Sequence, residues 1–168
     1  MKKIFSTKDN FLPKEEFTEI KNVITNNHYF PWYFYDFVNF KNDKYFQFVH
    51  VFFADFKNNS TFADLMRPVY KHLNAKAVLR SKVNLTTQTN KVIEHGYHND
   101  QLIKNKPLNC KNALLYLNDN NGYTIFKNNK EKVYSKSNKV LLFDNKHLHS
   151  GTSCTNQKAR FVININYV

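Results

Sequence analysis

The feature that most constrains the fold is a series of short strand-like segments in the second half of the chain. They cover residues 77–85, 92–100, 113–118, 123–126, 131–134, 139–143 and 160–167. In the first and the last of them apolar and polar residues alternate, as they do on strands with one buried face. Asp119-Asn120-Asn121-Gly122, between two of the segments, is a strong turn signal. Short strands joined by Asn-rich turns predict a β-sandwich or barrel.

The first part of the chain has helical patterns instead. A helix is predicted from Pro13 to about Thr25, because Pro13 suits the first helical position and the apolar residues after it recur at helical spacing. A capping box at Thr61 predicts the start of a second helix, which Pro68 is expected to kink. Between the two helices, residues 45–53 alternate as a strand does. The sequence therefore predicts a mainly β fold with N-terminal helices.

At 168 residues the chain is long enough to bury a sizeable core, and it contains no linker and no internal repeat. We expect one domain over residues 1–168. In it, a helical and aromatic N-terminal support (1–76) packs against a β core (77–168).

Two stretches allow two interpretations each. The segment Tyr29–Tyr35 is dense in aromatic residues, which are more often core than a substrate-binding wall. Arg80, Lys82 and Asn84 share one face of their predicted strand. That face is either solvated or lines a polar pocket, and the sequence does not decide between the two.

The formal net charge is +12 and the sequence pI is about 9.6. Such a charge is typical of proteins that attract nucleic acid or anionic substrates. The lysines are scattered, however, which favours a solvated Lys-rich surface produced by A/T-rich codons, as in some viral and bacterial genomes. Cys110 and Cys154 form no disulfide framework, and neither a membrane span nor a signal peptide is recognisable. We expect a cytoplasmic protein without a membrane partner, in the host cytoplasm if the source is viral.

The sequence His98-Asn99-Asp100 places an imidazole and a carboxylate two residues apart, on the same face of an extended strand. A second histidine from a distant strand would complete a two-histidine, one-carboxylate triad, which is typical of non-haem Fe(II) sites. Arg160 follows His149 by eleven residues, the length of a hairpin that would return a cation to the same cavity. A guanidinium there is suited to binding a carboxylate.

These residues belong to a longer pattern. From about Arg80 to Val168 the sequence resembles the 2-oxoglutarate/Fe(II)-dependent dioxygenases, in particular their prolyl-4-hydroxylase-like branch and its small phage-encoded members. The motifs that carry the resemblance, in the family's order, are His98-Asn99-Asp100, Gly122–Phe126, Lys139–Asp144, His149-Ser150-Gly151 and Arg160. The resemblance implies a double-stranded β-helix, which is a cupin-like jelly roll, for residues 77–168.

The resemblance also implies the metal ligands, His98, Asp100 and His149, which would be catalytic through the metal. His147 is the chief rival of His149, since both share one strand face. His149 is preferred because the family has a small residue two positions after its distal histidine, as Gly151 is here. His95 lies off the His-x-Asp spacing and is a weaker candidate.

In the family, 2-oxoglutarate binds the metal through its keto group and C1 carboxylate, and a basic residue holds its C5 carboxylate. Arg160 matches that basic residue. Tyr116 and Thr124 are further candidates for binding the cosubstrate, with a core role as the alternative for each; Tyr123 replaces an acidic residue of the family motif before Thr124. On the last strand, Phe161 and its apolar neighbours are expected to pack under the helices. Candidate residues for the pocket lining are Asn84, Val162 and Asn164.

The implied activity is the hydroxylation of a substrate with formation of succinate and CO2, using Fe(II), 2-oxoglutarate and O2, with ascorbate as a candidate reductant. The favoured substrate is a peptidyl side chain such as proline, and a small molecule is the next candidate. Two alternatives remain: a non-catalytic jelly-roll binding protein, and a basic oxygenase directed to nucleic acid.

Overall fold

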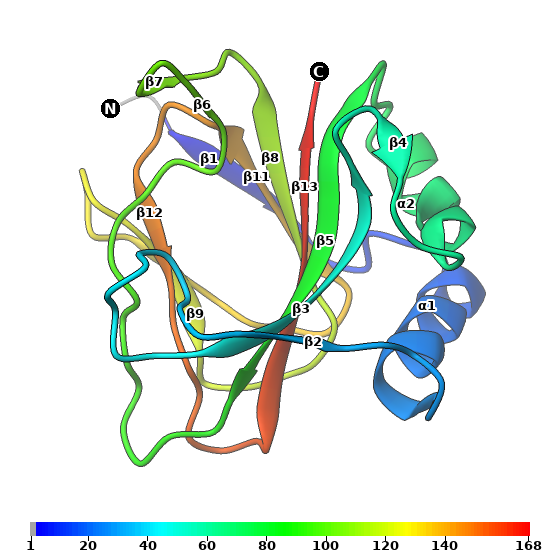
Figure 1. Ribbon diagram of the computed structural model, residues 1–168, viewed down its shortest axis with the longest axis horizontal. Coiled ribbons are helices and arrows are strands. Elements are labelled where there is room, and N and C mark those ends of the chain that lie inside the picture. Colours follow the sequence, from blue (N-terminus) through cyan, green and yellow to red (C-terminus); the bar gives the residue numbers. More distant parts are fainter. Residues whose placement is uncertain (1–2) are drawn as a thin grey trace.

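The computed structural model describes residues 3–168, which form two short helical regions and a set of mostly antiparallel strands (Figure 1). The helical elements are α1 (Lys14–Asn26), the 3-10 helix η1 (Ala63–Met66) and α2 (Arg67–His72). The strands are β1 (Phe5–Lys8), β2 (Tyr33–Tyr35), β3 (Gln47–Ala54), β4 (Lys57–Asn58), β5 (Val78–Thr87), β6 (Leu102–Ile103), β7 (Lys106–Pro107), β8 (Lys111–Tyr116), β9 (Tyr123–Phe126), β10 (Lys132–Tyr134), β11 (Lys139–Asp144), β12 (His149–Gly151) and β13 (Ala159–Tyr167).

Most strands belong to two antiparallel sheets. The major sheet has the order β1-β11-β8-β13-β5-β3-β2, with β4 paired to β3, and the minor sheet has the order β10-β9-β12. In Figure 1 the minor sheet lies opposite the major sheet, while α1 and α2 lie on the outer side of the major sheet. This arrangement is the expected jelly roll, and β1, β2 and β3 extend it with strands from the N-terminal part of the chain.

The main hydrophobic core lies between the helices and the outer face of the major sheet. Ile20 and Ile24 of α1 are each 1% exposed and share this core with Ile163 and Ile165 of β13, which are fully buried. Fully burying an aliphatic side chain contributes about 1.5–3 kcal/mol each. The predicted alternation of the last strand is therefore confirmed: its apolar face packs under the helices, which leaves the face of Arg160 for the interior of the jelly roll.

The second helix differs from its prediction. Thr61 does not cap it; instead the Ser60 hydroxyl accepts a hydrogen bond from the backbone N–H of Phe62 (2.9 Å), and a 3-10 turn precedes α2. Pro68 lies in the first turn of α2, where a missing N–H is harmless, so it helps to begin the helix and does not kink it. Neither helix of residues 3–168 is long and apolar enough to span a membrane.

The prediction of a strand over residues 92–100 was wrong. Only isolated bridges form there, Glu94 with Thr152 and His98 with His149. Gly96 adopts a positive φ of 91°, which interrupts an extended chain, so the segment runs as a loop alongside β12, at the edge of the minor sheet. The bridge at His98 nevertheless ties this loop to β12.

The aromatic segment 29–35 divides between the two interpretations given for it. Phe30 is 5% exposed and packs against the ring of His50, whose nitrogens bond the Pro31 carbonyl and the Ser60 hydroxyl. Tyr33 and Phe34 of β2, in contrast, are more than half exposed. Because β2 is the edge strand of the major sheet, it has a neighbour on one side only, and the core interpretation is wrong for it.

Candidate metal centre

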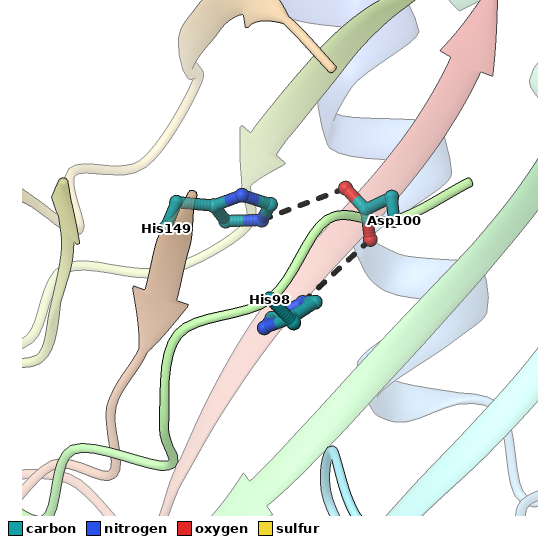
Figure 2. Close-up of side chains that lie close together, drawn as sticks. All are labelled: His98, Asp100 and His149. Carbon is teal, nitrogen blue, oxygen red and sulfur yellow. Dashed lines mark ion pairs between the residues drawn. The ribbon is translucent and has the colours of Figure 1, made fainter. Parts of the chain in front are cut away.

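Three side chains converge at one end of the space between the two sheets. His98 and Asp100 come from the loop before β6, and His149 begins β12 (Figure 2). Nε2 of His149 lies 3.5 Å from one carboxylate oxygen of Asp100, and Nε2 of His98 lies 3.8 Å from the other. Ligand atoms of all three residues lie within 4.8 Å of one another, so the group could hold a metal ion.

Backbone hydrogen bonds hold the two histidines side by side. The N–H of His98 donates to the carbonyl of His149 (3.0 Å), and the N–H of His149 donates to the carbonyl of His98 (3.1 Å). Nδ1 of His149 faces the His147 carbonyl, and Nδ1 of His98 faces the Gly96 carbonyl. When Nδ1 carries the proton, the Nε2 lone pairs are free for a metal, which is the usual way a protein orients histidine ligands.

Burial and neighbouring charges together favour the protonation states that a metal requires in the three candidate ligands. Burial lowers the pKa of His98 to about 4, with the neighbouring His149 acting in the same direction, and it also lowers the pKa of His149. Burial alone would raise the pKa of Asp100, but His149 and Arg80 beside it hold that pKa well below its usual range. At neutral pH the site therefore offers two neutral imidazoles and one carboxylate.

Other residues fix the Asp100 carboxylate. Oδ1 accepts hydrogen bonds from Arg80 (3.1 Å) and Asn164 (2.9 Å). The backbone N–H of Asp100 donates to Asn145, a buried residue that also bonds the loop at Gln101. Oδ2 is buried and has no hydrogen-bond partner among residues 3–168, although it is the oxygen that faces His149. A buried carboxylate oxygen that faces an imidazole nitrogen and accepts no hydrogen bond is what a site built for a cation should contain.

The other end of the same space holds a buried guanidinium. Arg160 is 5% exposed; its Nε donates to the Ser135 hydroxyl (2.8 Å) and its Nη2 lies 3.4 Å from the Thr124 hydroxyl. Tyr116 donates to the same hydroxyl (2.9 Å) and lies under the guanidinium. Arg160 forms no ion pair with any acid in the described part of the chain. A buried cation with only neutral partners is suited to binding an anion.

A glycine makes room for Arg160. A Cβ atom on Gly122 would lie 2.7 Å from Cδ of Arg160 and 2.7 Å from the Ser153 carbonyl oxygen. Any side chain there would displace the guanidinium. Ser135 and Gly122 thus belong to this end of the site.

The two ends face one pocket, here called the inner pocket. It is lined by His98, Asp100, His149, Thr124 and Arg160 and by the three predicted lining residues Asn84, Val162 and Asn164. Tyr116 lies beneath it and reaches it through Thr124. Of the two interpretations of the Arg80-Lys82-Asn84 face, the polar pocket is the one that the structure confirms.

Three further ionisable residues, His147, His95 and Lys82, lie in or near the inner pocket. His147 is half-buried and contributes only its carbonyl group to the site. His95 lines the inner pocket, is 6% exposed, and has no hydrogen-bond partner for either ring nitrogen within residues 3–168. Lys82 also lines the pocket; burial, aided by Arg80 and opposed by Asp100, lowers its pKa to about 8.

Sequence reasoning missed Asn145 and Ser135, and it did not pair Arg80 with Asp100. Asparagine and serine are common in turns, so neither residue stood out. The signal for Arg80 was present, since it lies on the polar face of β5, but its partner depended on the path of a loop.

The fold is that of the 2-oxoglutarate/Fe(II) oxygenases. No protein-family model matches the sequence, and a search of curated proteins gave no match. Solved structures do match. Viral collagen prolyl hydroxylase from Paramecium Bursaria Chlorella virus-1, solved with 2-oxoglutarate, is 16% identical with a TM-score of 0.63, over 99% of this chain and 98% of that one.

Two further structures have the same fold. A prolyl hydroxylase from Trichoplax adhaerens, in complex with a hypoxia inducible factor peptide fragment, is 13% identical with a TM-score of 0.72, over 99% of this chain and 84% of that one. HygX from Streptomyces hygroscopicus, solved with nickel and 2-oxoglutarate, is 13% identical with a TM-score of 0.63, over 98% of this chain and 82% of that one. At these identities the likeness establishes the fold, and function has to be argued from the site.

Proposed function

We propose that this protein is a dioxygenase that uses Fe(II) and 2-oxoglutarate to hydroxylate an organic substrate, forming succinate and CO2. The observation that carries the proposal is the pairing of two incomplete sites in one pocket. Among residues 3–168, one end has a buried carboxylate oxygen of Asp100 that faces His149 and has no hydrogen-bond partner, and the other end has the buried Arg160 guanidinium, which has no acidic partner. A metal chelated by a dicarboxylate would complete both.

His98, Asp100 and His149 are the proposed metal ligands. Two nitrogens and one oxygen occupy one face of a metal and leave the remaining positions open, which suits Fe(II). When bound, Fe(II) with 2-oxoglutarate and O2 supplies oxidative decarboxylation coupled to hydroxylation. The part played by the protein is to keep both imidazoles neutral and to hold the Asp100 carboxylate through Arg80 and Asn164.

Arg160, Thr124 and Tyr116 are the proposed residues for the C5 carboxylate of 2-oxoglutarate. Arg160 and Asn164 lie four residues apart on β13, about 13 Å along the strand. A five-carbon dicarboxylate together with the Arg160 side chain spans such a distance. Asn84 and Val162 face each other across β5 and β13 between the two ends and would contact the carbon chain.

The nature of the substrate is a further part of the proposal. A peptidyl side chain such as proline is favoured, supported by the Trichoplax adhaerens structure, which contains a peptide fragment. HygX has also been solved with hygromycin B, which keeps a small molecule as the next candidate. Neither of these neighbours supports the nucleic-acid alternative. Cys110 and Cys154 are buried free thiols, which agrees with the proposed reducing cytoplasm, where ascorbate or another reductant keeps iron as Fe(II).

The test is turnover without the main substrate. The protein is incubated with Fe(II), ascorbate, 2-oxoglutarate and O2, succinate is followed by mass spectrometry, and binding of 2-oxoglutarate to the Mn(II)-loaded protein is measured in parallel. Succinate should form above the metal-only background and should not form with His149→Ala. No succinate together with no binding of 2-oxoglutarate would contradict the proposal and favour a binding protein.

A further inference from the structure

The end of the inner pocket that contains His98, Asp100 and His149 is called the metal end. Beside it lies a second, larger cavity of about 690 Å³, here called the outer cavity. It shares Lys82, His98 and Asp100 with the inner pocket. The roles proposed above for metal and cosubstrate leave it unassigned. Because His98 and Asp100 line it, it is the space from which we expect a substrate to reach the metal.

Two cations of β5 line the outer cavity. Arg80 and Lys82 are two residues apart, so their side chains project from the same face of the strand. Asp100 is the only acid among the described residues that line it. Arg80 uses Nη2 on Asp100, while its Nε is buried without a partner. The Lys82 ammonium group has no hydrogen bond or ion pair with any residue between 3 and 168, although Lys82 is half-buried.

The charges of the site do not balance once metal and cosubstrate are counted. A divalent metal, Arg80, Lys82 and Arg160 carry five positive charges, whereas Asp100 and the 2-oxoglutarate dianion carry three negative ones. Uncompensated charge in a partly buried space is costly. An anionic group brought by another ligand would offset the excess at Lys82.

The remaining walls of the outer cavity are largely apolar. They include Phe37, Phe40, Val49, Val51 and Leu102. Phe40 and Leu102 are about half exposed, at 52% and 53%. Such side chains are covered well by an apolar or aromatic body, and they give no site for a second charge.

We propose that the substrate carries a carboxylate or a phosphate, attached to an apolar or aromatic body, and that Lys82 binds this anion beside the metal. The inference rests on the proposed function and names the chemical class of its substrate. The anion belongs to the substrate and not to 2-oxoglutarate, because Arg160 takes one carboxylate of the cosubstrate and the metal takes the other. Of the two cations that line the outer cavity, Arg80 is paired with Asp100, which leaves Lys82 for the anion. An acidic residue or carboxylate end close to the hydroxylated side chain of a peptide meets this requirement.

The test uses Mn(II)-loaded protein saturated with 2-oxoglutarate, so that no turnover occurs. Three probes are titrated at constant ionic strength: N-acetylphenylalanine, its neutral amide, and phenyl phosphate. The readout is the broadening of probe proton signals by the bound Mn(II), which reports binding close to the metal. Either the carboxylate or the phosphate probe should bind wild type at least tenfold more tightly than the amide does.

Variants assign that binding to Lys82. Lys82→Met should weaken the binding of the preferred anionic probe at least tenfold, whereas Lys82→Arg should keep most of the affinity for it. Neither variant should change the weak binding of the amide. Lys71→Met removes the same charge from the exposed surface of α2 and should behave as wild type. Thermal unfolding of each variant checks that the fold is retained.

Three results would overturn the inference. The first is that the anionic probe binds wild type and Lys82→Met equally well. The second is that the bound Mn(II) broadens the signals of neither anionic probe. A tenfold loss of 2-oxoglutarate affinity in Lys82→Met would assign the ammonium group to the cosubstrate instead. If wild type does not bind 2-oxoglutarate in the presence of Mn(II), the proposed function itself fails and this inference fails with it.

Discussion

The two ends of the inner pocket are charged groups stabilised in opposite ways. At the metal end, Oδ1 of the Asp100 carboxylate accepts hydrogen bonds from Arg80 and Asn164, so the protein compensates part of this charge without a metal. At the other end, Arg160 is equally buried, but its polar partners among residues 3–168 are the neutral hydroxyls of Ser135 and Thr124, with the Tyr116 ring beneath the guanidinium. The metal end is therefore organised by the protein, whereas the Arg160 end is completed by its ligand.

The largest expected effect is loss of metal binding at the organised end. Asp100→Ala removes one ligand and leaves the Arg80 guanidinium without its counter-ion. Because loss of supporting residues around a metal costs about 10–100-fold in affinity, loss of the ligand itself should cost at least about 100-fold. Anaerobic titration with Fe(II) or Mn(II) measures it. Asp144→Ala, an exposed carboxylate on β11, should bind metal as wild type does, and equal affinity in both variants would contradict the assignment.

At the other end, Arg160→Ala should weaken the binding of 2-oxoglutarate and leave the affinity for the metal unchanged. Losing a buried charge-assisted pair costs about 2–5 kcal/mol, which is a loss of roughly 30-fold or more. Arg160→Lys should recover part of it, since a point charge replaces the planar fork. Calorimetry with the Mn(II)-loaded protein measures the affinity of wild type and both variants for 2-oxoglutarate. If Arg160→Ala binds 2-oxoglutarate normally, another cation such as Arg80 or Lys82 holds the carboxylate.

A pair of glycine variants sharpens the role of packing at the Arg160 end. Gly122→Ala places a methyl group within 2.7 Å of Arg160 and a carbonyl oxygen, and overpacking of this kind lowers the free energy of unfolding by about 1–3 kcal/mol. Gly151→Ala brings its methyl group only to 3.7 Å from the guanidinium, an ordinary contact. Denaturant unfolding should separate the two variants. Similar stabilities would mean that the Gly122 site relaxes without cost.

The smallest effect concerns pH in the metal-free protein. The folded state lowers the pKa of His98 to about 4 from an ordinary value of 6.5, so the unfolded chain binds more protons between these values. His98 therefore lowers the free energy of unfolding as the pH falls from 6.5 towards 4, by about 1–2 kcal/mol over the first one and a half units. Replacing it with glutamine should reduce that pH dependence. An unchanged slope in His98→Gln would show that other groups cause it.

Much of this fold could be predicted from local sequence. The alternation in residues 160–167 fixes which face of β13 is buried, because a strand has a period of two and the apolar set must meet the helices. The helix from Lys14 was equally readable, since Ile20 and Ile24 lie one turn apart. These elements depend on residues close together in the chain.

The rest depends on contacts between distant residues. The loop with His98 and Asp100 follows Gly96, whose positive φ no periodicity reveals, and it is positioned by Asn145, which lies 45 residues after Asp100 in the sequence. The exposure of β2 follows from its place at the sheet edge. The candidate ligands could still be selected, because their residue types and order resemble a family motif and do not depend on the loop path.

The central claim is that one dicarboxylate bridges a metal at His98, Asp100 and His149 and the guanidinium of Arg160. The direct test is the affinity of 2-oxoglutarate with and without Mn(II), measured by calorimetry on wild type, Asp100→Ala and Arg160→Ala. In wild type the metal should strengthen binding at least tenfold. Asp100→Ala should lose this enhancement, while Arg160→Ala should keep it at a lower overall affinity. Binding of 2-oxoglutarate that is equally strong with and without metal in wild type would contradict the account.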